Sequence, residues 1–129
     1  MYIYANPNPV AGNRTGDCVV RAIALALDMS WDDVYDDLCL IGKEMGDWGN
    51  KNEVWGAYLK QHGFRRYAIP NTCPDCYTVE DFCLDHPRGT YILGTGTHVV
   101  CTKDGNHLDT WNSSDECPVF YWEKGRDDR

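Results

Sequence analysis

The stretch from Gly16 to Leu27, with the sequence GDCVVRAIALAL, decides the fold, because a polar, glycine-rich loop gives way in it to an apolar run. Alanine and leucine favour the helix. Four apolar residues of the run recur at the spacing of one buried helix face: Val20, Ile23, Ala24 and Leu27. The stretch therefore predicts a buried helix with Cys18 at its N-terminus.

Three further helices are expected after this one. Ser30, followed by two aspartates, is typical of an N-cap and predicts a second helix that ends near residues 42–46. Apolar spacing predicts a third over about 52–62, and Thr78 opens a short fourth helix that Pro87 closes. These helices fill most of the first two thirds of the chain.

The spacing of apolar residues along the chain changes after residue 88 from the helical pattern to one typical of strands. Short β-rich segments at 90–93, 97–102, 106–111 and 118–122 are separated by turns rich in glycine, which predicts an antiparallel sheet. A short strand at 65–69 and an extended start at 2–4 are also expected. Helices followed by a sheet make an α+β protein.

Length and charge bound the function. The 129 residues suit a single domain, 1–129, with a frayed tail at 122–129. A net charge of -8 argues against DNA or RNA as a partner, because binding either requires basic side chains. The chain lacks an apolar run long enough for a membrane span or a signal peptide, so we expect a cytoplasmic protein with no membrane partner. Its oligomeric state stays open.

Cysteine usage indicates reduced thiols, because the chain has seven cysteines, an odd number, and no export signal. Three of them lie in apolar runs and are expected to be buried: Cys39, Cys83 and Cys101.

Cys18 is the candidate nucleophile. At a helix N-terminus the macrodipole and the backbone N–H groups stabilise a thiolate. Attack on a carbonyl creates an oxyanion, for which the Cys18 N–H and the Asn13 side chain are the expected donors. Asp17 competes for a role beside the thiol, and capping of the helix is the interpretation we favour for it.

His98 is the candidate base, because it opens the apolar strand that includes Val99. The other histidines fit a surface position better. Asp109 lies eleven residues later, where the next strand returns toward His98 after the Asp104-Gly105 turn. An acid there would orient the imidazole, with Asn112 as its rival.

These residues resemble the papain-like cysteine peptidase superfamily, in which a helix-opening cysteine precedes a strand-borne histidine and then Asn or Asp. The segment from Asp109 to Trp111 is similar to the Asn-Ser-Trp segment of that family, whose tryptophan shields the histidine. The loop before Cys18 is similar to the oxyanion-donor loop, with Asn13 where Gln is usual. The likeness is greatest to bacteriocin-processing peptidases and to short papain-like proteins of phage genomes.

The resemblance implies a papain-like α+β fold, with the nucleophile helix packed on the sheet, and a cysteine hydrolase that uses Cys18, His98 and Asp109. Such an enzyme acts on an amide, peptide or isopeptide bond of a protein or peptide through a thioester and needs no cofactor. Three tryptophans are candidates to line its cleft: Trp48, Trp55 and Trp111.

Two alternatives stay open. A papain-like fold without chemistry would be a binding protein, for example a phage-encoded protein that binds a host partner. Cys73 and Cys76 form a C-x-x-C pair, which is half of a zinc site. The remaining two ligands would come from a further set: Cys83, His86 or Cys117.

Overall fold

The computed structural model describes residues 1–12, 16–70 and 74–125, and over these residues the protein is α+β, with four helices and one six-stranded mixed sheet. The helices are α1 (Cys18–Leu27), α2 (Trp31–Met45), α3 (Asn52–Gln61) and α4 (Val79–Asp85). The strands are β1 (Tyr2–Tyr4), β2 (Phe64–Ala68), β3 (Thr90–Gly94), β4 (Val99–Lys103), β5 (Asn106–Asp109) and β6 (Phe120–Lys124). Each expected helix is present within a few residues of its expected bounds.

Local capping explains where two of the helices begin. The Ser30 hydroxyl accepts a hydrogen bond from the Asp33 N–H at 3.1 Å, which opens α2. Thr78 and Asp81 exchange side-chain and backbone hydrogen bonds in a capping box, which opens α4.

The sheet has the strand order β1-β5-β4-β3-β6-β2 and is mixed, whereas the sequence predicted an antiparallel one. All neighbours are antiparallel except β1, which lies parallel to β5. The start of the chain is held there by backbone hydrogen bonds, among them Ala5 N–H to the Asp109 carbonyl at 2.9 Å. Pairing over such a sequence separation leaves no local pattern, which is why it was missed.

The end of the chain also departs from expectation. The frayed tail was expected to begin at residue 122, where the last expected strand ends, but residues 122–124 all belong to β6, which pairs with β2 and β3. Trp122 is 3% exposed and packs in the main core, so burial of its indole fixes this strand.

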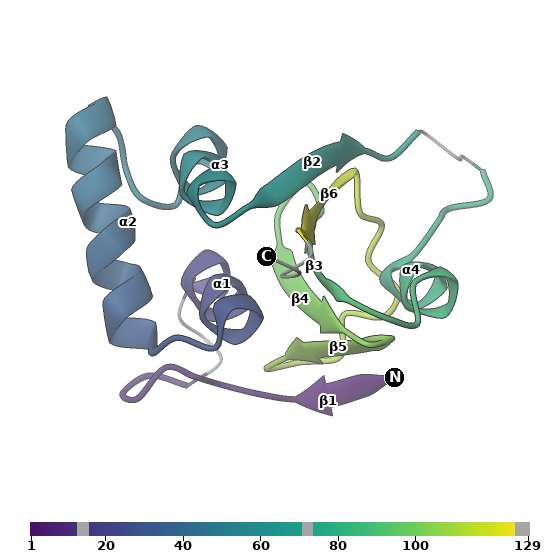
Figure 1. The fold of residues 1–129 in the computed structure, drawn as a ribbon. Coiled ribbons are helices and arrows are strands. Elements are labelled where there is room, and N and C mark those ends of the chain that lie inside the picture. Colours follow the sequence, from purple (N-terminus) through teal and green to yellow (C-terminus); the bar gives the residue numbers. More distant parts are fainter. Residues whose placement is uncertain (13–15, 71–73, 126–129) are drawn as a thin grey trace.

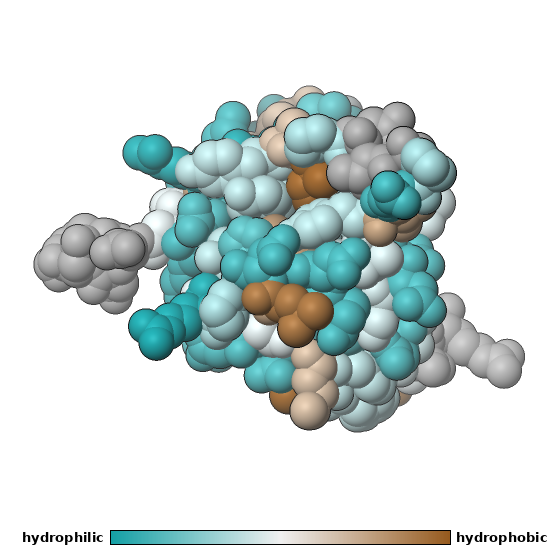
Figure 2. Space-filling model, turned by 90° about the vertical axis from the view of Figure 1, so that its right-hand side faces the viewer, coloured by the Kyte–Doolittle hydropathy of each residue, from teal (hydrophilic) through white to brown (hydrophobic). Residues whose placement is uncertain are grey.

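Helices α1, α2 and α3 lie on one face of the sheet and α4 lies on the other (Figure 1). Alternation along the strands sends Ile92 and Cys101 into the core under α1 to α3, and Leu93 and Val100 into a smaller core under α4. The face of the molecule on the α4 side is mostly hydrophilic around a small hydrophobic patch (Figure 2). The two cores therefore sandwich the central strands.

The cysteine predictions are confirmed in part. Cys83 and Cys101 are buried, as expected. Cys39 is exposed, because α2 buries Val34, Leu38 and Ile41 and turns Cys39 away from that face. Among the residues that the structure describes, no helix has both the length and the apolar character that a membrane crossing requires.

We predict that Gly94→Ala destabilises the fold through overpacking. Gly94 lies opposite Phe120 in the β3–β6 pair, and a Cβ at Gly94 would overlap the Phe120 ring. Urea denaturation should show a loss of about 1–3 kcal/mol or more. Gly96→Ala is the matched control, because a Cβ at Gly96 meets nothing within 4 Å, and it should change the free energy of unfolding by less than about 0.5 kcal/mol. Equal stability of the two variants would contradict this packing.

Candidate active site

The structure brings Cys18, His98 and Asp109 together. Cys18 is the first residue of α1, His98 immediately precedes β4, and Asp109 is the last residue of β5. Because β4 and β5 are antiparallel neighbours, the start of one lies beside the end of the other. The His98 imidazole lies close enough to the Cys18 thiol for each to shift the pKa of the other, and the His98 Nε2 lies 2.6 Å from the Asp109 Oδ2. The imidazole therefore lies between the thiol and the carboxylate.

The Asp109 carboxylate is itself held in place. The Ser113 hydroxyl donates to Oδ2 at 2.9 Å, and the Thr110 N–H donates to Oδ1 at 2.8 Å. Asp109 is 5% exposed and Ser113 is fully buried, so water competes little with these bonds. Ser113 was not among the residues singled out from the sequence, because a serine four residues after Asp109 in a polar turn has no distinguishing pattern.

The electrostatics of the site favour a charged Cys18–His98 pair. Burial alone would raise the pKa of the Cys18 thiol, but the hydrogen bond and charge of His98 and a hydrogen bond to the Val99 backbone outweigh it and lower the pKa. Burial alone would lower the pKa of His98, but the hydrogen bonds to Asp109 and Cys18 outweigh it and raise the pKa to about 9. Each partner thus stabilises the charged form of the other.

Trp111 and Asn112, the two residues that follow Asp109 and Thr110, differ in whether they contact His98. The Trp111 ring lies 4.8 Å from the His98 ring, between centroids, and so covers it. The Asn112 side chain contacts His107 Nε2 at 3.3 Å. Of the two rivals for the contact with His98, the structure therefore places Asp109 there and Asn112 elsewhere.

His107 was expected at the surface, but it is fully buried. Burial lowers its pKa, and its ring lies 5.4 Å from the Tyr2 ring between centroids. Its burial follows from the parallel pairing of β1 with β5, which covers this edge of the sheet.

Asp17 lies at the N-cap position of α1, but its side chain does not make the expected capping hydrogen bond to the N–H groups of the first helical turn. Its carboxylate instead accepts hydrogen bonds from Asn8 Nδ2 at 2.8 Å, from Trp31 Nε1 at 2.9 Å and from the Arg21 guanidinium. Asp17 is 8% exposed. One buried carboxylate therefore joins the N-terminal loop, α1 and α2 directly beside Cys18.

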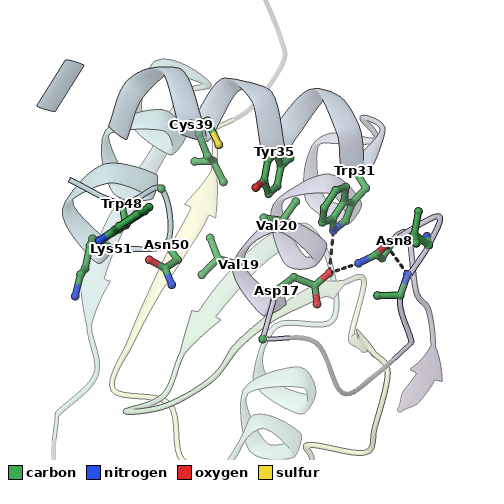
Figure 3. A pocket seen from close by; sticks show the side chains of 15 residues that line it. Asn8, Asp17, Val19, Val20, Trp31, Tyr35, Cys39, Trp48, Asn50 and Lys51 are labelled. Atoms are coloured by element: carbon green, nitrogen blue, oxygen red, sulfur yellow. Dashed lines mark hydrogen bonds between the residues drawn. The ribbon is translucent and has the colours of Figure 1, made fainter. Parts of the chain in front are cut away.

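An apolar groove lies beside the start of α1, between α1, α2 and the loop before α3, and has a volume of about 810 Å³. Its walls include Val19 and Val20 of α1 and Trp31 and Tyr35 of α2 (Figure 3). Of the three tryptophans proposed to line a cleft, Trp48 lines this groove, Trp111 covers His98, and Trp55 is fully buried in the core. The sequence did not indicate the groove, because its walls come from four separate segments: the N-terminal loop, the start of α1, α2 and the loop before α3.

Two of the sequence predictions lie outside the described residues: the oxyanion role of Asn13 and the participation of Cys73 in a zinc site. Cys76 is described and is exposed. Within 1–12, 16–70 and 74–125, no three His, Cys, Asp or Glu side chains are grouped as a metal site would require.

Comparisons with known proteins identified no relative: no family model, no curated protein and no solved structure matches the chain.

We predict that Asp17→Asn is strongly destabilising. The change removes the negative charge beside the buried Arg21 guanidinium and weakens the hydrogen bonds that Asn8 and Trp31 donate to the same carboxylate, and breaking a buried ion pair costs about 3–5 kcal/mol. Urea denaturation would measure the loss. The control is Asp28→Asn, since Asp28 forms an exposed ion pair with Lys103 and exposed pairs contribute about 0–1 kcal/mol. Similar losses for the two variants would contradict the joining role of Asp17.

Proposed function

We propose that the protein is a cysteine hydrolase with a papain-like arrangement, in which Cys18 attacks the carbonyl of an amide, peptide or isopeptide bond. The observation that carries the proposal is the position of His98 between Cys18 and Asp109, with its ring bound to the Asp109 carboxylate at 2.6 Å. A helix-opening cysteine, a histidine at a strand start and an acid on the next strand are the elements of that arrangement.

The residues divide the reaction among them. Asp109 occupies His98 Nε2, so Nδ1 is the ring nitrogen left to face Cys18. The thiolate adds to the carbonyl carbon, and the imidazolium then gives its Nδ1 proton to the leaving amine, which departs and leaves a thioester. His98, now neutral, takes a proton from water as that water attacks the thioester, and the acid product and the Cys18 thiolate are released.

The surroundings of the pair suit this sequence. The Cys18 backbone N–H lies at the N-terminus of α1, where it and the helix macrodipole favour a developing oxyanion. Trp111 covers the His98 ring and so limits the access of water to its bond with Asp109. The proposed substrate is a protein or peptide. The described residues hold the thiol, the imidazole and the carboxylate, whereas Asn13, the expected second oxyanion donor, lies outside them.

The first test is the pH dependence of alkylation by iodoacetamide, with the modified thiol located by mass spectrometry. Because the pKa of Cys18 is lowered, its thiolate forms below the ordinary thiol value of 9.0, and alkylation should begin there. Because the pKa of His98 is raised to about 9, the charged pair persists up to that pH and is lost above it. Cys18 should react selectively at neutral pH, while buried Cys83 and Cys101, whose pKa values are raised, should not.

Two histidine variants make the test specific. His98→Ala should remove the low-pH reactivity of Cys18, whereas His86→Ala should keep it, since His86 bonds to the Phe82 carbonyl and stacks on the Phe82 ring. If Cys18 reacts no faster at neutral pH than the exposed Cys39, the hydrolase proposal fails. The non-catalytic binding protein is then the function to pursue.

A second test concerns the carboxylate. Asp109→Asn should lower the pKa of His98 from about 9 toward its ordinary value of 6.5, because the Asp109 hydrogen bond and charge both raise it. NMR titration of the histidine ring signals measures this change. Asp115→Asn, an exposed acid in the same loop, should leave the His98 titration in place. An unchanged His98 pKa in the Asp109→Asn variant would contradict the orienting role of Asp109.

A further inference from the structure

His98 ends a short turn, and the side chain of Thr95, which begins the same turn, binds its backbone. Strands β3 and β4 form a hairpin in which the last paired residues are Gly94 and Val99. Residues 95–98 connect the two strands. Because the direction of a side chain depends on the dihedrals of its own backbone, the closure of this turn sets where the His98 ring points.

The turn does not close in the way that is usual for a short hairpin. In the usual closure the N–H of the fourth residue donates to the carbonyl of the first, and the favoured types need a positive φ at the first central residue. The central residues here are Gly96 and Thr97; the structure describes both, and neither has a positive φ. The His98 N–H donates instead to the Thr95 hydroxyl oxygen at 2.9 Å. A side-chain oxygen thus takes the place that a backbone carbonyl ordinarily has.

Further hydrogen bonds join Thr95 to the same turn. The Thr95 N–H donates to the His98 carbonyl at 2.8 Å, and the Thr95 hydroxyl donates to that carbonyl at 3.3 Å. The hydroxyl oxygen also accepts from the Thr97 N–H at 3.2 Å. Both backbone polar groups of His98 are therefore bound to Thr95, and the hydroxyl takes part in every contact but one.

The burial of His98 makes these bonds important. His98 is 9% exposed and Thr95 is half-buried. A backbone N–H in such surroundings costs free energy when it has no acceptor. Without the Thr95 hydroxyl, the His98 N–H would have to reach water or a rearranged turn, and either change alters the backbone that carries the imidazole.

The turn brings two groups to Cys18. The His98 imidazole and the Val99 backbone each lower the pKa of the Cys18 thiol, and the two residues are adjacent in the chain. Thr95 holds this pair of residues from the turn, and the pairing of Val99 with Gly94 holds it from the strand. A shift of the turn would therefore move the imidazole and the Val99 backbone together relative to the thiol.

The far end of the His98 ring is held by other segments. Its Nε2 lies 2.6 Å from the Asp109 Oδ2, and the Trp111 ring covers it. Asp109 and Trp111 fix the ring from β5 and the segment after it, whereas Thr95 fixes the backbone from the opposite end of the side chain. The two sets of contacts are therefore independent, and a change at Thr95 can be tested with Asp109 in place.

We propose that Thr95 is a positioning residue of the candidate active site, whose hydroxyl fixes the backbone of His98 and thereby points the imidazole toward Cys18. This inference rests on the proposed function, because it assigns Thr95 a part in the activation of the nucleophile. The sequence did not single out Thr95, since a threonine within a Gly-Thr-Gly-Thr segment has no distinguishing pattern.

The test is the pH profile of Cys18 alkylation by iodoacetamide. Thr95→Val keeps the branched shape and removes the hydroxyl, so the profile should move to higher pH by about one unit, with alkylation at neutral pH slowed roughly tenfold. Thr95→Ser keeps the hydroxyl and should restore the wild-type profile. Thr97→Val is the matched control, because Thr97 is exposed in the same turn and binds Thr95 through its backbone, and it should leave the profile in place.

A loss of stability alone would give a different result. It would expose the buried Cys83 and Cys101 to the reagent, whereas a misplaced imidazole changes the profile of Cys18 and leaves those two thiols protected. The labelled thiols are located by mass spectrometry, so that both effects are read in one experiment.

Amide hydrogen exchange in the wild-type protein is a measurement that does not depend on the folding of a variant. The Thr97 N–H lies in an exposed turn but donates to the Thr95 hydroxyl, so it should exchange slowly. The reference is the Gly96 N–H, which has no acceptor within the part of the chain that the structure describes. After correction for intrinsic rates, NMR should show the Gly96 amide exchanging roughly tenfold faster or more.

The outcomes separate the two proposals. A wild-type profile in Thr95→Val, or a Thr95→Ser profile that matches that of Thr95→Val, overturns the role of the Thr95 hydroxyl and leaves the hydrolase standing. Equal exchange of the Thr97 and Gly96 amides overturns it as well, even if Thr95→Val does not fold. Loss of selective Cys18 alkylation in the wild-type protein is the failure of the proposed function itself.

Discussion

The packing of α1 on β4 is the contact on which the rest of the site depends. Ile23 and Ala26 of the helix share one core with Val99 and Cys101 of the strand. Because α1 begins at Cys18 and β4 begins directly after His98, this packing brings the Cys18 thiol to the His98 ring. Burial of these apolar residues thus positions a polar site that could not hold itself together in water.

The site residues could be predicted from sequence where geometry is local. The Asp104-Gly105 turn has φ values of 49° and 81°, which suit a tight hairpin, and a tight hairpin fixes which residue of β5 returns to the start of β4. The position of Asp109 near His98 could therefore be predicted by counting residues from the turn. The helix that Cys18 opens follows from its apolar spacing, so the fold class and the three central residues were within reach.

The rest depends on contacts between distant segments, which leave no periodic pattern. Asp17 follows the rule for a helix cap, yet Asn8 and Trp31 approach from two other segments and take its carboxylate. Of these contacts of Asp17, the ion pair with Arg21 was the one that the sequence could have indicated, because residues four apart lie on the same face of a helix. The parallel position of β1 and the burial of His107 arise only once the sheet is assembled, and the groove between α1 and α2 arises only once the helices pack together.

The two outer strands of the sheet differ from its centre in a way that bears on solubility. β1 is three residues long, and β2 presents exposed Arg65 and Arg66 in a chain of opposite net charge. A short edge and a charged edge both discourage the addition of strands from other molecules. The open sheet is thus protected at both edges against pairing with strands of other molecules, a protection that a closed barrel obtains by having no free edges.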